Sequence, residues 1–85
     1  MKLRDDLATK LIDGELVIFN RDAEQIHTLN PTARHIWQLL EQGRTLEQIV
    51  EQFVEDYGID RERAKVDIEN TLEAFVSLGL MAHND

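Results

Sequence analysis

A predicted strand ends and a helix begins within the stretch Leu29-Asn30-Pro31-Thr32-Ala33-Arg34-His35-Ile36-Trp37-Gln38-Leu39-Leu40, which decides the fold. Asn30 is a favourable N-cap residue. Pro31 suits the first helical position, because its φ is already helical and its missing N–H is not needed there. Asn30 also precedes proline and is therefore biased toward extended backbone. The sequence thus changes at this joint from the pattern of strands to the pattern of helices.

The residues before the joint have the pattern of a small antiparallel sheet. Two apolar-rich runs, Leu7 to Ile12 and Glu15 to Asn20, are separated by Asp13-Gly14. A two-residue Asp-Gly spacer between strands is typical of a hairpin with a type I′ turn. The polar connection Arg21-Asp22-Ala23-Glu24 has the length of a hairpin loop, and it leads to the alternating segment Gln25 to Leu29. The sequence therefore predicts a three-stranded antiparallel meander.

Three helices are expected after the joint. In the first, apolar residues recur at i, i+3, i+4 and i+7, and Gly43 follows as a C′ residue. The second begins with a capping box over Thr45 to Gln48 and continues as an amphipathic helix until Gly58. Asp60 can cap the third, which we expect to end before Gly79.

The predicted fold class is therefore α+β, with a three-stranded antiparallel sheet followed by three helices in a winged helix-turn-helix-like arrangement. We expect residues 1–85 to form a single domain. Met1 to Asp6 and His83 to Asp85 are polar, and we expect both ends to be frayed.

The composition limits the possible partners. Nine basic against seventeen acidic residues give a formal net charge of −8, which repels phosphate backbones and disfavours nucleic acid. The chain has no cysteine, which excludes disulfides and thiolate metal sites. Its longest apolar run is Leu16 to Phe19, and its first ten residues hold no apolar signal segment. We therefore expect a cytoplasmic protein that binds neither nucleic acid nor a membrane.

No residue pattern predicts catalysis, a metal site or a cofactor. The histidines are His27, His35 and His83, and none of their spacings is that of a local metal site. Ser77 is the only serine and does not lie in a nucleophile motif, and there is no glycine-rich phosphate loop. The helical carboxylates have the spacing of solvated faces. We expect no catalytic residue, no metal and no cofactor, and hence no enzyme.

The last predicted strand, Gln25 to Leu29, would lie at an edge of the meander with unpaired backbone N–H and C=O groups. Such an edge can accept an extended peptide as a further strand. A groove between the strand and a helix would then receive alternate peptide side chains. From the pattern alone, the edge could also be covered merely by solvent, or by a second copy of the chain in a homodimer.

Several spaced motifs occur together over nearly the whole chain. They are Leu29-Asn30-Pro31-Thr32-Ala33 with Ile36, Trp37 and Leu40, then Thr45 to Val50, Tyr57 to Asp60, Asp67-Ile68, and Phe75 with Leu78, Gly79, Leu80 and Met81. With these motifs in this order, the chain resembles the PqqD-like family. That family contains the D protein of coenzyme PQQ synthesis and related recognition elements for ribosomally made, modified peptides.

The resemblance implies a noncatalytic adaptor that binds the leader segment of a precursor peptide and presents it to a modifying enzyme, such as a radical-SAM protein or a peptidase. In family members the leader adds as a strand beside the third strand and lies against the third helix. The matching features do not distinguish PQQ synthesis from lasso-peptide or thioether-peptide systems. On this chain the implied peptide-binding residues are Gln25, Ile26, His27 and Thr28 on the strand, and Lys65, Glu69, Leu72 and Val76 on one flank of the helix.

Two other functions remain open at this point. A small transcriptional regulator would place the third helix in the major groove of DNA, and Arg61, Arg63 and Lys65 lie in the first turns of that helix. The acidic residues later in the same helix and the net charge oppose this reading. A homodimerisation module would instead pair two copies through the exposed strand edge.

Overall fold

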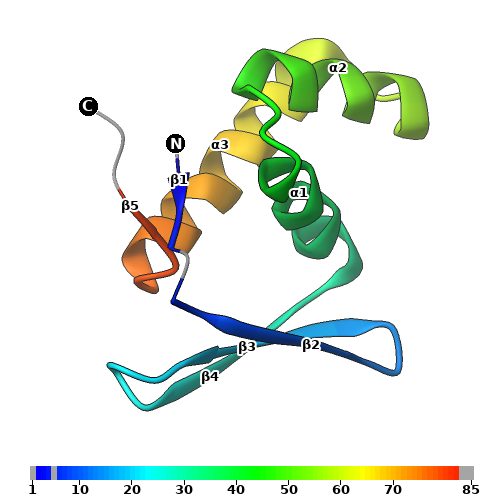
Figure 1. Cartoon of the computed structure of the whole chain (residues 1–85). Coiled ribbons are helices and arrows are strands. Elements are labelled where there is room, and N and C mark those ends of the chain that lie inside the picture. The colour runs from blue at the N-terminus through cyan, green and yellow to red at the C-terminus, as the bar shows by residue number, and fades with distance from the viewer. Residues whose placement is uncertain (1, 5, 83–85) are drawn as a thin grey trace.

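The predicted fold class is confirmed by a computed structural model, which describes residues 2–4 and 6–82. A three-stranded antiparallel sheet of order β2-β3-β4 precedes three helices (Figure 1). A two-stranded sheet of β1 and β5 joins the ends of the described chain. The elements in chain order are β1 (Lys2–Leu3), β2 (Ala8–Ile12), β3 (Glu15–Asn20), β4 (Gln25–Leu29), α1 (Pro31–Glu41), α2 (Leu46–Tyr57), α3 (Arg61–Ser77) and β5 (Met81–Ala82).

The predicted Asp-Gly hairpin is confirmed. Asp13 and Gly14 have φ values of 51° and 82°, and positive φ at both central residues defines a type I′ turn. This turn pairs Ile12 with Glu15 and sets the register of β2 on β3. The guanidinium of Arg34 in α1 donates to the Gly14 carbonyl oxygen, which ties the turn to the helical layer.

The predicted helix starts are confirmed by their capping contacts. The Asn30 side chain accepts a hydrogen bond from the Ala33 N–H at 2.8 Å. Thr45 and Gln48 form the reciprocal capping box, and the Asp60 side chain accepts from the Arg63 N–H. These caps satisfy backbone donors that a helix cannot satisfy internally, so each helix begins where the local sequence indicates.

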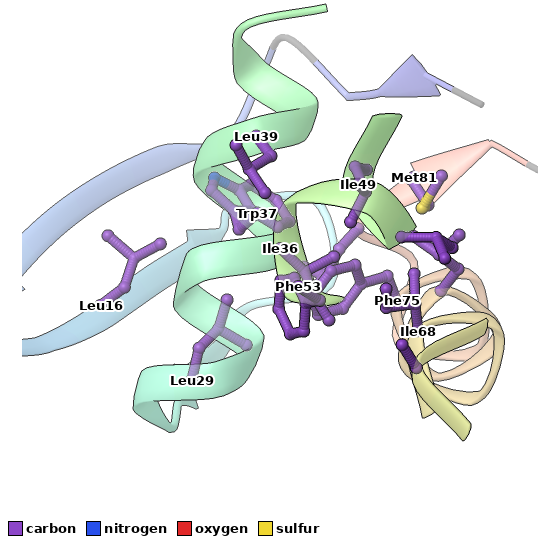
Figure 2. Packing of buried hydrophobic residues seen from close by; sticks show 14 of the residues in the cluster. Leu16, Leu29, Ile36, Trp37, Leu39, Ile49, Phe53, Ile68, Phe75 and Met81 are labelled. Atoms are coloured by element: carbon purple, nitrogen blue, oxygen red, sulfur yellow. The ribbon is translucent and has the colours of Figure 1, made fainter. Parts of the chain in front are cut away.

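The hydrophobic core lies between one face of the sheet and the helices (Figure 2). Leu16 and Ile18 of β3 and Leu29 of β4 are buried on that face. Trp37 of α1 packs edge to face against Phe75 of α3, with 5.4 Å between the ring centroids. All three helices lie on one side of the three-stranded sheet (Figure 1). The opposite face of the sheet is not covered by any of them.

The prediction of a frayed start was wrong for Lys2 and Leu3, which form β1. Leu3 pairs with Met81 in antiparallel register and packs against the core, and the Arg4 N–H donates to the Leu80 carbonyl oxygen at 3.1 Å. These contacts join segments from opposite ends of the sequence, so the local polarity of the N-terminus does not reveal them. The same prediction for Met1, Asp5 and His83 to Asp85 lies outside the described residues.

Candidate functional site at the free edge of the sheet

β4 is the edge strand that the sequence predicts. It pairs with β3 on one side, and among the described residues no strand borders its other side. Its register on β3 aligns Leu29 with Leu16 and Gln25 with Asn20. The outer backbone of this strand is therefore free to pair with another extended chain.

The register determines which β4 residues offer backbone groups at the free edge. Residues that flank a two-residue hairpin turn exchange hydrogen bonds, and bonded pairs then alternate along the strands. Ile12 and Glu15 flank the turn and therefore form a bonded pair. Every second residue of β3, starting with Glu15, bonds to β2. The residues between them, which include Ile18, bond to β4. In β4, His27 therefore bonds inward to Ile18. The N–H and C=O groups of β4 that point outward are those of Ile26 and Thr28.

The side chains of β4 alternate between the two faces of the sheet. Leu29 is buried in the core, whereas Ile26 is 65% exposed on the uncovered face. His27 is half-buried on the core face, and its Nε2 atom is buried without a hydrogen-bond partner in the described part of the chain. A buried polar atom without a partner is costly, so the core face of β4 is less well satisfied at His27 than at Leu29.

The other edge strand, β2, is less suited to accept a chain. Lys10 lies in the middle of β2, and a lysine on an edge strand discourages further strand pairing. β4 has the sequence Gln-Ile-His-Thr-Leu and contains no lysine, arginine, aspartate or glutamate. Of the two edges, β4 therefore carries the smaller barrier to strand addition.

The helix residues implied by the resemblance lie in two different environments. Lys65 and Glu69 of α3 are exposed, whereas Leu72 is only 8% exposed and belongs to the core. Val76 is half-buried and packs against that core. The main packing partners of α3 are α2 and β5, whereas those of β4 are β3 and α1. The structure therefore brings the four strand residues together, and it does not pack them extensively against α3.

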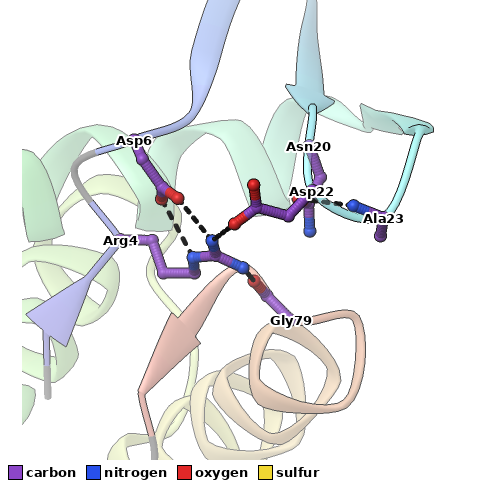
Figure 3. Close-up of polar contacts among 6 residues, drawn as sticks. All are labelled: Arg4, Asp6, Asn20, Asp22, Ala23 and Gly79. Carbon is purple, nitrogen blue, oxygen red and sulfur yellow. Dashed lines mark hydrogen bonds and ion pairs between the residues drawn. The ribbon is translucent and has the colours of Figure 1, made fainter.

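Arg4 holds the loop that leads into β4, a role that sequence reasoning missed (Figure 3). Its guanidinium donates to Asp22 in that loop at 2.7 Å, to the Gly79 carbonyl oxygen at 3.3 Å, and also to Asp6. Within the loop, the Ala23 N–H donates to Oδ1 of the buried Asn20. No local pattern links residues so far apart in the sequence.

The hydrogen bond from Arg4 holds the pKa of the Asp6 carboxyl below its ordinary value. Because the folded-state pKa is the lower one, the contact stabilises the fold above the usual titration range of aspartate. That stabilisation is lost as the pH falls through the folded-state pKa. The Arg4 and Asp6 side chains are 31% and 50% exposed, so solvent screens this contact and its contribution to stability is small.

Within residues 2–4 and 6–82, no group of three or more histidine or acidic side chains is placed to hold a metal ion. His35 has structural partners instead. Its Nδ1 lies 2.9 Å from the Tyr57 hydroxyl, and its ring stacks on Phe53 at 5.1 Å between centroids. None of the helices in the described part of the chain is long and apolar enough to cross a membrane.

Fold and site together define a class, namely small α+β proteins in which a three-stranded sheet with a free edge strand precedes three helices. The family model of coenzyme PQQ synthesis protein D (PqqD) matches residues 15–81, and the chain belongs to that family. None of the curated proteins compared with it matches the chain.

Two solved structures are similar to this chain. TbiB1 in complex with the TbiA(beta) leader peptide is 29% identical, with a TM-score of 0.92 over 100% of both chains. Lasso peptide synthetase B1 complexed with the leader peptide is 22% identical, with a TM-score of 0.90 over 96% of both chains. The second similarity concerns the fold alone.

Proposed function

We propose that this chain is a noncatalytic adaptor that binds the leader segment of a ribosomally made precursor peptide by strand addition to β4. The observation that carries this proposal is the free, uncharged edge of β4, where the backbone groups of Ile26 and Thr28 point outward. Membership of the PqqD family and the likeness to TbiB1, which was solved with a leader peptide, support the same function.

Binding would combine a backbone ladder with side-chain selection. Ile26 and Thr28 would exchange hydrogen bonds with the leader, and such main-chain bonds supply affinity for any extended sequence. Gln25 and His27 would face leader side chains on the core side of the sheet. Lys65 and Glu69 would provide charged contacts from α3, and the half-buried Val76 would provide an apolar one, whereas Leu72 would support them from the core.

The adaptor would help the chemistry by holding the precursor near a modifying enzyme, such as a radical-SAM protein or a peptidase, in the cytoplasm. If the same adaptor also binds that enzyme, the local concentration of the peptide rises without any new contact to the reacting residues. A homodimer formed through β4 would occupy the same edge, so leader binding and this mode of self-association would compete.

Titration of the ¹⁵N-labelled protein with a synthetic leader peptide tests the proposal. The peptide is the N-terminal part of a small precursor reading frame beside this chain's gene, next to a radical-SAM enzyme or a peptidase. We expect amide shifts centred on residues 25–29, with smaller ones near Lys65 and Glu69. Shifts confined to other surfaces would contradict the proposal, as would binding of duplex DNA with a steep salt dependence.

A further inference from the structure

The uncovered face of the sheet carries an apolar row that the proposed function does not explain. The register places Ala8 opposite Phe19 and Phe19 opposite Ile26, so the row crosses all three strands of the β2-β3-β4 sheet. Ile26 ends the row at the free edge and is 65% exposed, whereas Phe19 beside it is half-buried. The row therefore stops at the strand that would receive the leader.

The neighbouring row on the same face has a different character. It runs from Lys10 through Val17 to Thr28, so it begins with a charge and ends with a hydroxyl at the free edge. Only the row that ends at Ile26 is apolar throughout. At the free edge, the uncovered face therefore presents the apolar side chain of Ile26 and, two residues further along β4, the hydroxyl of Thr28.

The geometry of a sheet determines which side chains of an added strand lie beside Ile26 and Thr28. Ile26 and Thr28 direct their backbone groups to the free edge and their side chains to the uncovered face. Neighbouring residues of paired strands share a face. A chain that bonds to Ile26 and Thr28 must therefore place alternate side chains on the uncovered face, one beside each of them, whichever direction it runs.

We infer that the leader residue beside Ile26 is a large apolar one, which continues the row Ala8–Phe19–Ile26 into a fourth strand. This inference rests on the proposed function and adds a sequence requirement to it. Packing an aliphatic or aromatic side chain against Ile26 removes apolar surface of both partners from water, and cross-strand pairs of this kind stabilise a sheet. The leader residue beside Thr28 is under no such requirement.

A leader side chain is the favoured occupant, because the row is continuous with the edge where the leader would bind. A second copy of the chain is a weaker candidate. Each copy has a formal net charge of −8, which opposes self-association.

Selection of a phage-displayed library of random linear peptides on the immobilised protein tests the inference. Wild type is compared with Ile26→Lys and with the matched control Thr28→Lys, which adds the same charge to the same face of the same strand. We expect wild-type peptides to share one large apolar position. Peptides selected on Ile26→Lys should carry aspartate or glutamate at this position. Peptides selected on Thr28→Lys should keep the apolar residue and show an acidic preference two residues away.

Calorimetric titration then measures the effect with one selected peptide. Changing its apolar residue to aspartate should weaken binding to wild type about fivefold or more and strengthen binding to Ile26→Lys. If the peptides selected on Ile26→Lys keep the same apolar residue, the inference is overturned. It is also overturned if wild type self-associates in sedimentation, Ile26→Lys does not, and both select the same peptides. The row would then be an interface between copies. Enrichment of no peptide on any variant would contradict the proposed function, and the inference with it.

Discussion

Replacement of Trp37 by alanine is expected to lower the free energy of unfolding by about 3–5 kcal/mol, the cost of deleting a buried aromatic side chain. Trp37 is 2% exposed, and its ring packs edge to face on Phe75, so it joins α1 to α3. A chain of this length has a total stability of roughly 4–13 kcal/mol. The loss is therefore a large part of the total stability, and it unfolds the variant if the wild-type stability lies near the lower end of that range.

Urea denaturation followed by far-UV circular dichroism measures this loss. Trp37→Phe is the matched control, because it retains an aromatic ring and removes an indole N–H that is buried without a partner in the described residues. We expect Trp37→Phe to lose much less stability than Trp37→Ala. A loss below about 1 kcal/mol for Trp37→Ala would place the ring outside a tightly packed core.

Replacement of Thr28 by proline is expected to weaken leader binding by about tenfold to a hundredfold while the fold is retained. The Thr28 N–H points to the free edge, so its loss removes a hydrogen bond to the peptide and none to β3. The proline ring also occupies space at the edge where the peptide backbone would approach. Proline is tolerated in edge strands for the same reason.

His27→Pro is the matched control, since it places the same residue one position earlier in the same strand. The His27 backbone bonds inward to Ile18, so this variant loses a ladder bond and should be markedly less stable in thermal unfolding. Thr28→Pro should unfold near the wild-type temperature. Unchanged leader affinity in folded Thr28→Pro would exclude Thr28 as a ladder donor, and equal destabilisation by both prolines would contradict the assigned bonding pattern.

Most of the fold was predictable because its signals are local. Asp13-Gly14 specifies its own turn type, and Asn30, Thr45 and Asp60 cap helices through residues only three positions away. The pairing of β1 with β5 was not predictable in this way. Two-residue strands have no periodicity, and the pairing depends on the folded core bringing Leu3 beside Met81.

The candidate site was likewise predictable only where its signals are local. The edge position of β4 follows from the order of three consecutive strands, so it could be predicted, and the hairpin turn then determines that Ile26 and Thr28 face outward. The helix side could not be resolved, because helical periodicity does not show how deeply Leu72 lies in the core. The contact of Arg4 with Asp22 joins distant segments and left no sequence signal.

Amide hydrogen exchange of the ¹⁵N-labelled protein, with and without the leader peptide, tests strand addition to β4 most directly. In the free protein, the Ile26 and Thr28 amides should exchange rapidly, because their N–H groups point to the open edge, whereas the His27 amide should be protected by its bond to β3. The peptide should slow exchange strongly at Ile26 and Thr28 and only slightly at His27. Unchanged exchange at Ile26 and Thr28 in the saturated complex would contradict strand addition to β4.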